Sequence, residues 1–190
     1  MEDTMTTTTI AVLVGSLRRG SLNHQLAQLA VDSAPTGVAV TIVDGLGEIP
    51  FYTEDLDSPD ALPVAASALR EAVGNADAVL LVTPEYNGTL PAVLKNAIDW
   101  TSRPFGEGAI KDKPVAVAGI SAGQYGGKWA HDDALRSAGV AGARVVKDVT
   151  LSIGGAYQRF ADGGPADDAE LVTQISALIA ELTSAVAVAA

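Results

Sequence analysis

Residues 78–101, AVLLVTPEYNGTLPAVLKNAIDWT, hold the pattern that decides the fold of this 190-residue chain. The segment opens with five apolar residues and no polar alternation, which is typical of a β-strand covered on both faces of its sheet. A short loop bounded by Pro84 and Pro91 follows, and apolar residues then recur at helical spacing through residues 90–101. A strand, a tight loop and a helix in this order predict one unit of a parallel α/β sheet.

The same unit recurs along the chain. Apolar segments typical of strands occupy residues 10–14, 38–43, 78–82, 115–120 and, less strongly, 144–149. Amphipathic segments typical of helices occupy residues 21–33, 61–75, 90–101, 127–138 and 167–188. Because strand–helix–strand connections are short and right-handed, this alternation predicts a three-layer, doubly wound α/β fold with a five-stranded parallel sheet. We expect a single domain over residues 1–190, with residues 1–9 as a disordered terminus.

One connection is longer than such a fold requires. Residues 44–63, DGLGEIPFYTEDLDSPDALP, lack hydrophobic periodicity, although ~2–6 residues suffice between the elements of an α/β unit. Pro50, Phe51 and Tyr52 indicate an ordered loop that packs against another surface. The pattern is equally compatible with a plain surface excursion and with a segment that lines the site or contacts a subunit.

Composition excludes several classes of function. With 12 basic and 23 acidic side chains, the net charge is -11, so the chain lacks the basic surface that nucleic acids and anionic membranes bind. The absence of cysteine removes disulfides and thiolate-held metals, and His24 and His131 are too few to build a metal site. No apolar run reaches the ~18 residues that span a bilayer. Residues 1–9 lack the features of a secretion signal. We therefore expect a soluble cytoplasmic protein.

Doubly wound sheets bind ligands beyond the carboxyl ends of their strands, near the point where the strand order reverses. The loop after the first strand, GSLRRGSLN at residues 15–23, leads into a helix whose N-terminal N–H groups suit a phosphate. We expect Ser16, Ser21 and Asn23 to add polar contacts and Arg18 to add a charged one. The glycine spacing matches neither a Walker loop nor a dinucleotide-binding loop. The alternative is that Ser21 only caps the helix while the arginines are solvated.

Two further loops complete the predicted site. In residues 83–91, Asn87-Gly88 favours a tight turn, and the aromatic ring of Tyr86 offers a flat face to a cofactor. The alternative is a purely structural turn. The residues expected to hold the edge of a cofactor there are Pro84, Glu85, Tyr86, Asn87 and Gly88. In residues 119–127, GISAGQYGG, the backbone at Ser121 and Gly123 can approach a ligand closely. This segment also matches the nucleophile elbow of α/β-hydrolases, but no acidic residue precedes a histidine in the order that such a triad needs.

Several other polar residues are expected to have plain roles. His131, Asp132 and Asp133 occupy consecutive helix positions that do not converge on a metal, so we predict a solvated helix face. His24 is predicted to lie at the surface. Asp99-Trp100 is predicted to pack or to contact a subunit rather than to react.

Together the three loops resemble the NAD(P)H-dependent FMN reductase family, which includes quinone, azo-dye and chromate reductases. The resemblance covers residues 10–150 and rests on three motifs: GSLR at residues 15–18 with Ser21 and Asn23, TPEYNGxxPxxLKNxxDW at residues 83–100, and SAG at residues 121–123. It implies a flavodoxin-like fold with strand order 2-1-3-4-5. Ser16, Arg18, Ser21 and Asn23 would then bind the FMN phosphate, residues 84–88 would border the isoalloxazine, and the loop through Ser121 and Gly123 would follow its pyrimidine edge.

The resemblance also implies a function. A hydride would pass from NADPH or NADH to the flavin, and electrons would then pass to a quinone, free flavin or another small acceptor, with no side chain needed as catalytic acid or base. It further implies a homodimer or homotetramer, and we expect the contact to involve Leu94, Ile98, Trp100, Phe51 and Tyr52. The alternatives are a non-catalytic flavodoxin-type electron carrier and a nucleotide-binding module without redox activity.

Overall fold

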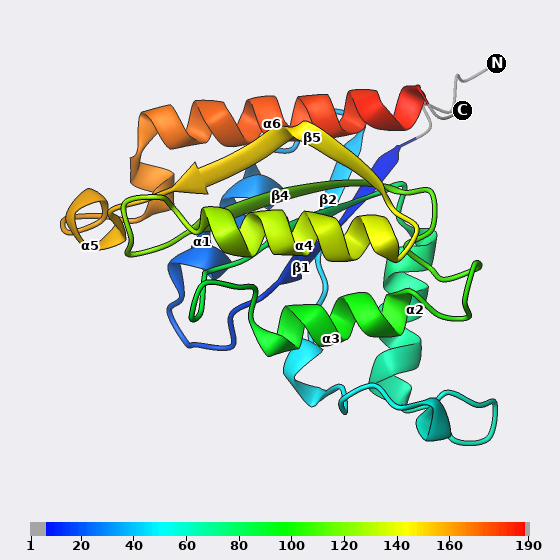
Figure 1. Cartoon of the computed structure of the whole chain (residues 1–190). Helices are drawn as coiled ribbons and strands as arrows, with labels where there is room; N and C mark the ends of the chain where they lie inside the picture. The colour runs from blue at the N-terminus through cyan, green and yellow to red at the C-terminus, as the bar shows by residue number, and fades with distance from the viewer. Residues whose placement is uncertain (1–6, 189–190) are drawn as a thin grey trace, which may run out of the picture.

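The computed structural model describes residues 7–188 and contains a five-stranded parallel sheet (Figure 1). The strand order is β2-β1-β3-β4-β5, which confirms the predicted flavodoxin-like topology. Register is regular in the centre of the sheet, where Val12 lies opposite Ile42 on one side and Leu80 on the other. The strands are β1 (Thr8–Val14), β2 (Val38–Ile42), β3 (Ala78–Val82), β4 (Pro114–Ile120) and β5 (Arg144–Ile153).

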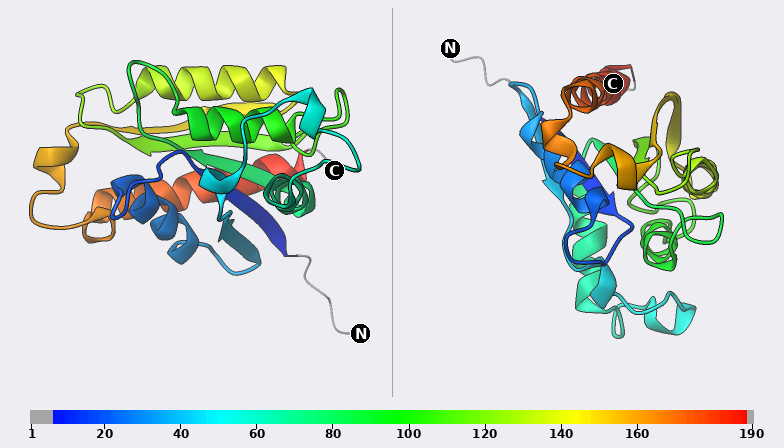
Figure 2. Two further views of the ribbon diagram at one scale, coloured as in Figure 1. Left: turned by 90° about the horizontal axis from the view of Figure 1, so that it is seen from below. Right: turned by 90° about the vertical axis from the view of Figure 1, so that its left-hand side faces the viewer.

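Helices cover both faces of the sheet, and Figure 2 shows it between the two helical layers. One layer contains α1 (Leu22–Asp32) and α6 (Ala169–Ala187), and its core includes Leu26 and Ile175. The other layer contains α2 (Val64–Asn75), α3 (Ala92–Thr101) and α4 (Lys128–Val140), and its core includes Leu69 and Leu94. The central strands β3 and β4 are buried throughout, as their uninterrupted apolar sequences predict, whereas the edge strands β2 and β5 are partly exposed.

The strand limits differ from the predicted ones at two places. Thr8 and Thr9 belong to β1 rather than to a disordered terminus, because they pair with Val38 and Ala39 of β2. Residues 1–6 of that predicted terminus lie outside the described residues. Strand β5 continues to Ile153 after a register irregularity opposite β4, and this extension carries Ser152 to the edge where the loops gather.

The long connection at residues 44–63 packs on α3. The Trp100 indole N–H donates to the Pro50 carbonyl at 2.8 Å, and the Asn96 side chain contacts the backbone of Pro50 and Tyr52. Trp100 is completely buried by this packing, and Leu94 and Ile98 are buried with it. The prediction that these three residues contact another subunit is therefore wrong, because all three are buried within the chain, and the alternative prediction that Trp100 packs is confirmed.

Helix α6 is long and apolar enough, by length and composition alone, to cross a membrane. One face of it packs on the sheet. The buried residues on that face are Leu171, Ile175, Leu178, Ile179 and Leu182. An apolar helix that covers a sheet can have the same composition as a membrane span, and packing on the sheet accounts for these five residues.

Candidate cofactor site

The three predicted loops meet at the carboxyl edge of the sheet. Strands β1 and β3 are neighbours, so the chain reverses its direction of progress across the sheet between β2 and β3. The loop after β1 is attached to β3, because the Gly15 amide donates to the Val82 carbonyl at 2.8 Å. A Cβ atom at Gly15 would lie 2.8 Å from Thr83 Oγ1, so the two chain segments touch at the switch point. The right-hand view in Figure 2 looks onto this edge.

The first loop ends in a well-formed helix start. Ser21 is the N-cap of α1, and its Oγ accepts a hydrogen bond from the Asn23 amide at 3.2 Å. Ser16 and Ser21 are buried, whereas Arg18 and Arg19 are exposed. His24 is exposed as predicted, and its Nε2 contacts the Ser16 carbonyl at 2.8 Å. Free N–H groups and the positive end of the helix dipole therefore lie beside two arginines, which is a suitable place for a phosphate.

Asn23 has a different position from the one that we predicted. Its side-chain amide donates to the Ile120 carbonyl and its side-chain oxygen accepts from the Ile120 amide, both at 2.9 Å. The residue is buried and joins the start of α1 to the end of β4. We therefore assign to Asn23 the placement of the Ser121 loop rather than a contact with phosphate.

The second loop is a tight turn with left-handed backbone at Asn87 (φ 52°) and Gly88 (φ 77°). The amide of Tyr86 donates to the Thr89 carbonyl at 3.0 Å, and the reverse bond measures 3.1 Å. Two consecutive positive φ angles at Asn-Gly are the signature of a type I′ turn. The turn leaves the Tyr86 ring half exposed at the edge of the site.

Contacts between this turn and α4 were not predicted from the sequence. Glu85 Oε2 accepts hydrogen bonds from the amides of Trp129 and Ala130 at 3.0 and 3.2 Å, and so caps a helix whose own N-cap is Gly127. A Cβ atom at Gly88 would lie 3.3 Å from the Trp129 ring. Glycines at these two positions reveal only that something approaches closely, so the sequence could not identify the helix as the partner.

A cavity of about 340 Å³ lies between the second loop and the start of α4. Its lining is Glu85, Ser121, Gly123, Tyr125, Gly127, Lys128 and Trp129. The third loop is anchored by β5, since the Ser121 amide donates to the Ile153 carbonyl at 2.9 Å. Tyr125 and Trp129 are 70 % and 63 % exposed, so aromatic surface faces outward at the mouth of the cavity.

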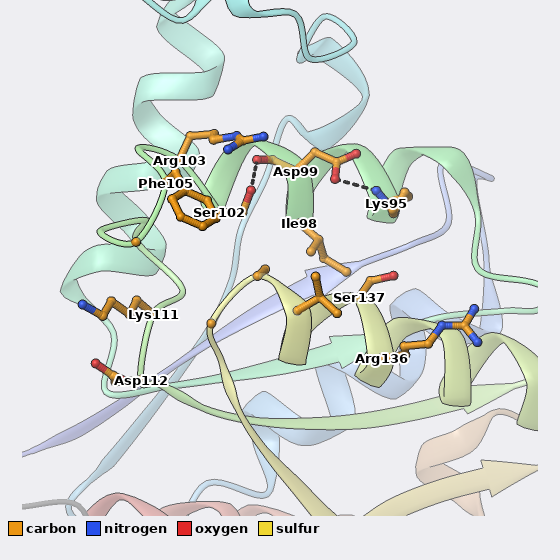
Figure 3. A pocket seen from close by; sticks show the side chains of 14 residues that line it. Lys95, Ile98, Asp99, Ser102, Arg103, Phe105, Lys111, Asp112, Arg136 and Ser137 are labelled. Atoms are coloured by element: carbon orange, nitrogen blue, oxygen red, sulfur yellow. Dashed lines mark hydrogen bonds and ion pairs between the residues drawn. The ribbon is translucent and has the colours of Figure 1, made fainter.

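A second and larger cavity, of about 620 Å³, lies between the C-terminal halves of α3 and α4 (Figure 3). Charged side chains surround it, among them Lys95 and Asp99, which pair at 2.5 Å. Asp112 and Gly142, joined by a 2.8 Å backbone hydrogen bond, place this cavity at the amino edge of the sheet. None of the predicted site residues lines it.

The prediction of a solvated face at His131 is wrong. Its side chain is completely buried, and its Nδ1 lies 2.8 Å from Ser152 Oγ. Burial lowers the pKa of His131 from its usual 6.5, against opposing contributions from the Thr83 carbonyl, Glu85 and Asp132. A histidine followed by two acidic residues on a helix gives no sequence signal of burial, because the neighbouring loops that cover it are distant in the chain.

The site fits a flavin mononucleotide. The start of α1 with Arg18 offers donors and positive charge for one phosphate, and the turn at residues 84–88 and the Ser121 loop offer flat edges and backbone for a ring. A parallel sheet of this order with such loops at its switch point defines a flavodoxin-like nucleotide-binding protein.

Comparisons with known proteins identify the family. Residues 8–158 match the family model of the NADPH-dependent FMN reductases. The chain is 40 % identical over 159 residues to a quinone reductase from Pseudomonas putida, with 84 % of each chain covered. It is 47 % identical over 117 residues, or 62 % of each chain, to a 2-hydroxy-1,4-benzoquinone reductase from a Burkholderia species.

A solved structure agrees with these sequence matches. The flavoenzyme NAD(P)H:(acceptor) oxidoreductase FerB from Paracoccus denitrificans superposes with a TM-score of 0.83 at 30 % identity, covering 95 % of this chain and 98 % of that one. The chain belongs to the NADPH-dependent FMN reductase family. The recognition made from the loop motifs is confirmed, and the family implies the FMN and NAD(P)H that the resemblance predicted.

Proposed function

We propose that this protein transfers electrons from NAD(P)H to a quinone or a similar small acceptor through FMN held at the carboxyl edge of the sheet. The meeting of the three family motifs around one switch point carries the proposal. The chemistry that bound FMN supplies is acceptance of a hydride and delivery of electrons, while the protein provides binding and orientation.

The phosphate end of the proposed site is the first loop. Arg18 is exposed beside the start of α1, and the hydroxyl of Ser21 caps that helix. A guanidinium pairs with phosphate through charge-assisted hydrogen bonds, and the helix N-terminus adds N–H donors. Ser16, buried at the base of the same loop, supplies backbone and hydroxyl groups at this position.

The ring end of the proposed site lies between two rigid segments. The turn at Asn87-Gly88 and the Ser121–Gly123 backbone border the ring, and Glu85 holds the start of α4 against the turn. These loops present few titratable groups, which suits a reaction in which no side chain has to donate or accept a proton.

Aromatic side chains at the mouth of the cavity provide a surface for the electron acceptor. Tyr125 and Trp129 expose flat rings at its mouth, and such rings stack on planar molecules. The relatives that act on quinones support a quinone as the acceptor of this chain. We place the reaction in the cytoplasm, in keeping with a reductant that is a soluble nucleotide.

A spectroscopic titration tests the proposal. Anaerobic addition of NADPH or NADH to the purified protein with FMN should bleach the visible flavin absorption, and a quinone should restore it. FMN should bind more tightly than riboflavin or FAD, because the phosphate pocket lies on one helix N-terminus. A flavin that binds but is not reduced by either nucleotide would instead indicate an electron carrier. A protein that never holds flavin would contradict the whole assignment.

We also propose that the protein forms a homo-oligomer through the cavity between α3 and α4. Phe105 and Val140 line this cavity and are 88 % and 85 % exposed. Ile98 is buried beneath these two residues and offers no surface to a partner, whereas in Figure 3 the charged end of Lys111 points away from the space between the helices. An apolar centre with a charged rim has the composition of a protein interface.

A further inference from the structure

His131 is buried in an unusual way for a residue near the start of a surface helix. Its side chain is 0 % exposed, while Lys128 and Asp132 on the same helix are 64 % and 57 % exposed and pair with each other. Of the buried polar residues within 7–188, His131 alone carries a group that ordinarily changes its charge near neutral pH. Keeping such a group out of water is costly, so its position calls for a physical reason.

The imidazole ring occupies a notch at the ends of three adjacent strands. Its Nδ1 contacts Ser152 Oγ of β5 at 2.8 Å, and Ser152 lies directly opposite Gly119 of β4. A Cβ atom at Gly119 would lie 2.5 Å from His131 Nε2 and would overlap the carbonyl oxygen of Thr83, which follows β3. The ring therefore fits only because residue 119 has no side chain.

These three strand ends carry the walls of the candidate cofactor site. Thr83 directly precedes the turn at residues 84–88, and Gly119 precedes Ser121 by two residues. Ser152 supports the third loop, since a Cβ atom at Gly126 would lie 2.6 Å from its carbonyl carbon. One side chain thus contacts the base of both loops that form the ring end of the site.

His131 also lies directly behind the cavity wall. The position that a Cβ of Gly127 would take is 3.5 Å from His131 Nε2, 3.5 Å from Ser121 Cβ and 3.6 Å from Glu85 Cβ. Ser121, Glu85 and Gly127 all line the cavity. The ring is therefore separated from the cavity by this wall alone and does not itself line it.

The surroundings favour a neutral ring. Burial lowers the pKa of His131, and the charged groups that face it are Glu85 from the second loop and Lys128 and Asp132 from α4. Nε2 makes no hydrogen bond within the described part of the chain, although the Thr83 carbonyl is close by. A proton added to the ring would place a buried charge next to an incompletely satisfied N–H group, at a cost in free energy.

We propose that His131 is a positioning residue of the flavin site, whose neutral ring holds the turn at residues 84–88 and the loop at residues 121–127 at a fixed separation. The inference rests on the proposed location of FMN and involves no contact between His131 and the cofactor. It predicts that FMN affinity depends on the ring nitrogens and on their protonation.

The test compares the wild type with His131→Phe, which keeps a ring and removes both nitrogens. Cofactor-free, full-length protein is titrated into FMN, and quenching of flavin fluorescence gives Kd between about pH 7.5 and about pH 5, where histidine changes its charge. Loss of one hydrogen bond should weaken FMN binding roughly 3-fold to 10-fold at the higher pH. The wild-type Kd should also rise more steeply on acidification than that of His131→Phe. The FMN phosphate titrates at about pH 6 in both proteins, so the difference between the two profiles isolates the histidine.

Two outcomes overturn the proposal while leaving the FMN site intact. They are an unchanged Kd in His131→Phe, and a Kd that is raised by the same factor at every pH, which is the result for a ring that only fills space. Thr101→Val, a buried polar residue at the far end of α3, is the matched control for general destabilisation. If it weakens FMN binding as much as His131→Phe does, the proposal is wrong.

A second variant keeps the test decisive if His131→Phe does not fold. Ser152→Ala leaves the ring in place and removes only the hydroxyl that contacts Nδ1. A loss of FMN affinity of roughly 3-fold to 10-fold supports positioning through this hydrogen bond, and an unchanged affinity contradicts it. A wild-type protein that does not bind FMN at all overturns the proposed site, and the role of His131 falls with it.

Discussion

The two cavities of this molecule differ in size, in lining and in the edge of the sheet at which they lie. The smaller, about 340 Å³, is bordered by glycine turns and backbone at the carboxyl edge, and the larger, about 620 Å³, by helix side chains and charges at the amino edge. Only the smaller one is lined by residues that the sequence predicts to bind the cofactor, among them Glu85, Ser121 and Gly123. Backbone shape at the ends of parallel strands, rather than the volume of the cavity, therefore distinguishes the proposed cofactor site.

Replacing one glycine near each cavity by alanine tests whether the two edges of the sheet differ in how tightly they are packed. Gly119→Ala places a Cβ atom against Thr83 and His131 below the cofactor site, and backbone atoms cannot move aside cheaply. We expect the free energy of unfolding to fall by about 3 kcal/mol or more, because overpacking forces the strands apart. Denaturant unfolding followed by circular dichroism measures it.

The matched variant is Gly139→Ala on α4 beside the larger cavity. Its new Cβ would meet Val145 Cγ2 at 3.4 Å, an ordinary contact, and alanine is the better helix former. Its stability should stay at or above that of the wild type. Equal losses in the two variants would show that the carboxyl edge is no more tightly built than the amino edge.

The next largest effect should come from Arg18. Arg18→Ala removes a guanidinium from the proposed phosphate position, and charge-assisted hydrogen bonds contribute roughly 1.5–3 kcal/mol, so FMN binding should weaken about 10-fold to 150-fold. Fluorescence titration measures the change, and the affinity for riboflavin should stay nearly constant because it lacks the phosphate.

Arg19→Ala is the internal control for Arg18. Both side chains are exposed, so neither variant should lose stability. Equal weakening of FMN binding by the two would indicate diffuse positive charge instead of a specific pair, and no weakening by either would make the first loop a capped turn only.

Acid should affect the cofactor edge through His131. Its pKa is lowered by burial, so between its folded-state value and 6.5 the unfolded chain binds more protons than the folded one. The contribution of His131 to stability is therefore fully present above about pH 6.5 and falls with decreasing pH, by up to about 1.4 kcal/mol per pH unit. Thermal unfolding in a pH series should show this slope in the wild type and in His24→Gln, and a smaller slope in His131→Phe.

The smallest effect on FMN is expected at the larger cavity. Val140→Glu places a charge on its apolar centre, which should disrupt the proposed oligomer and leave FMN affinity unchanged, because no predicted cofactor residue lines that cavity. Light scattering should give a multiple of the 19.3 kDa chain for the wild type and a smaller mass for the variant. A wild type that is monomeric at micromolar concentration would contradict the proposed interface at the larger cavity.

Much of the fold could be predicted because its signals are local. Apolar runs locate all five strands, and the spacing of apolar residues locates the five long helices to within a few residues. The turn at Asn87-Gly88 was predictable for the same reason, since these two residues adopt positive φ angles more readily than others. The strand order was predicted from the family resemblance, because local propensity does not indicate which strands are adjacent in the sheet.

The errors fell where distant segments meet. The side chain of Asn23, a predicted phosphate ligand, bonds to Ile120, which lies 97 positions away, and Trp100, predicted either to pack or to contact a subunit, packs under Pro50. His131 is predicted to face solvent because residues 131–133 are consecutive helix positions that do not converge on a metal, yet it is buried. In each case the sequence shows a polar or aromatic side chain but not the distant segment that it contacts.

The sequence by itself determined the strands, the helices, the loops that hold chemistry and the family, because each of these depends on residues close together in the chain. Only the tertiary structure decided which polar groups remain available for a ligand. The Asn23 side chain bonds to Ile120, Glu85 Oε2 accepts from the start of α4, and the His131 ring is enclosed by the ends of three strands. Burial and hydrogen bonding are properties of contacts between segments, so they become defined only when the sheet brings those segments to one edge.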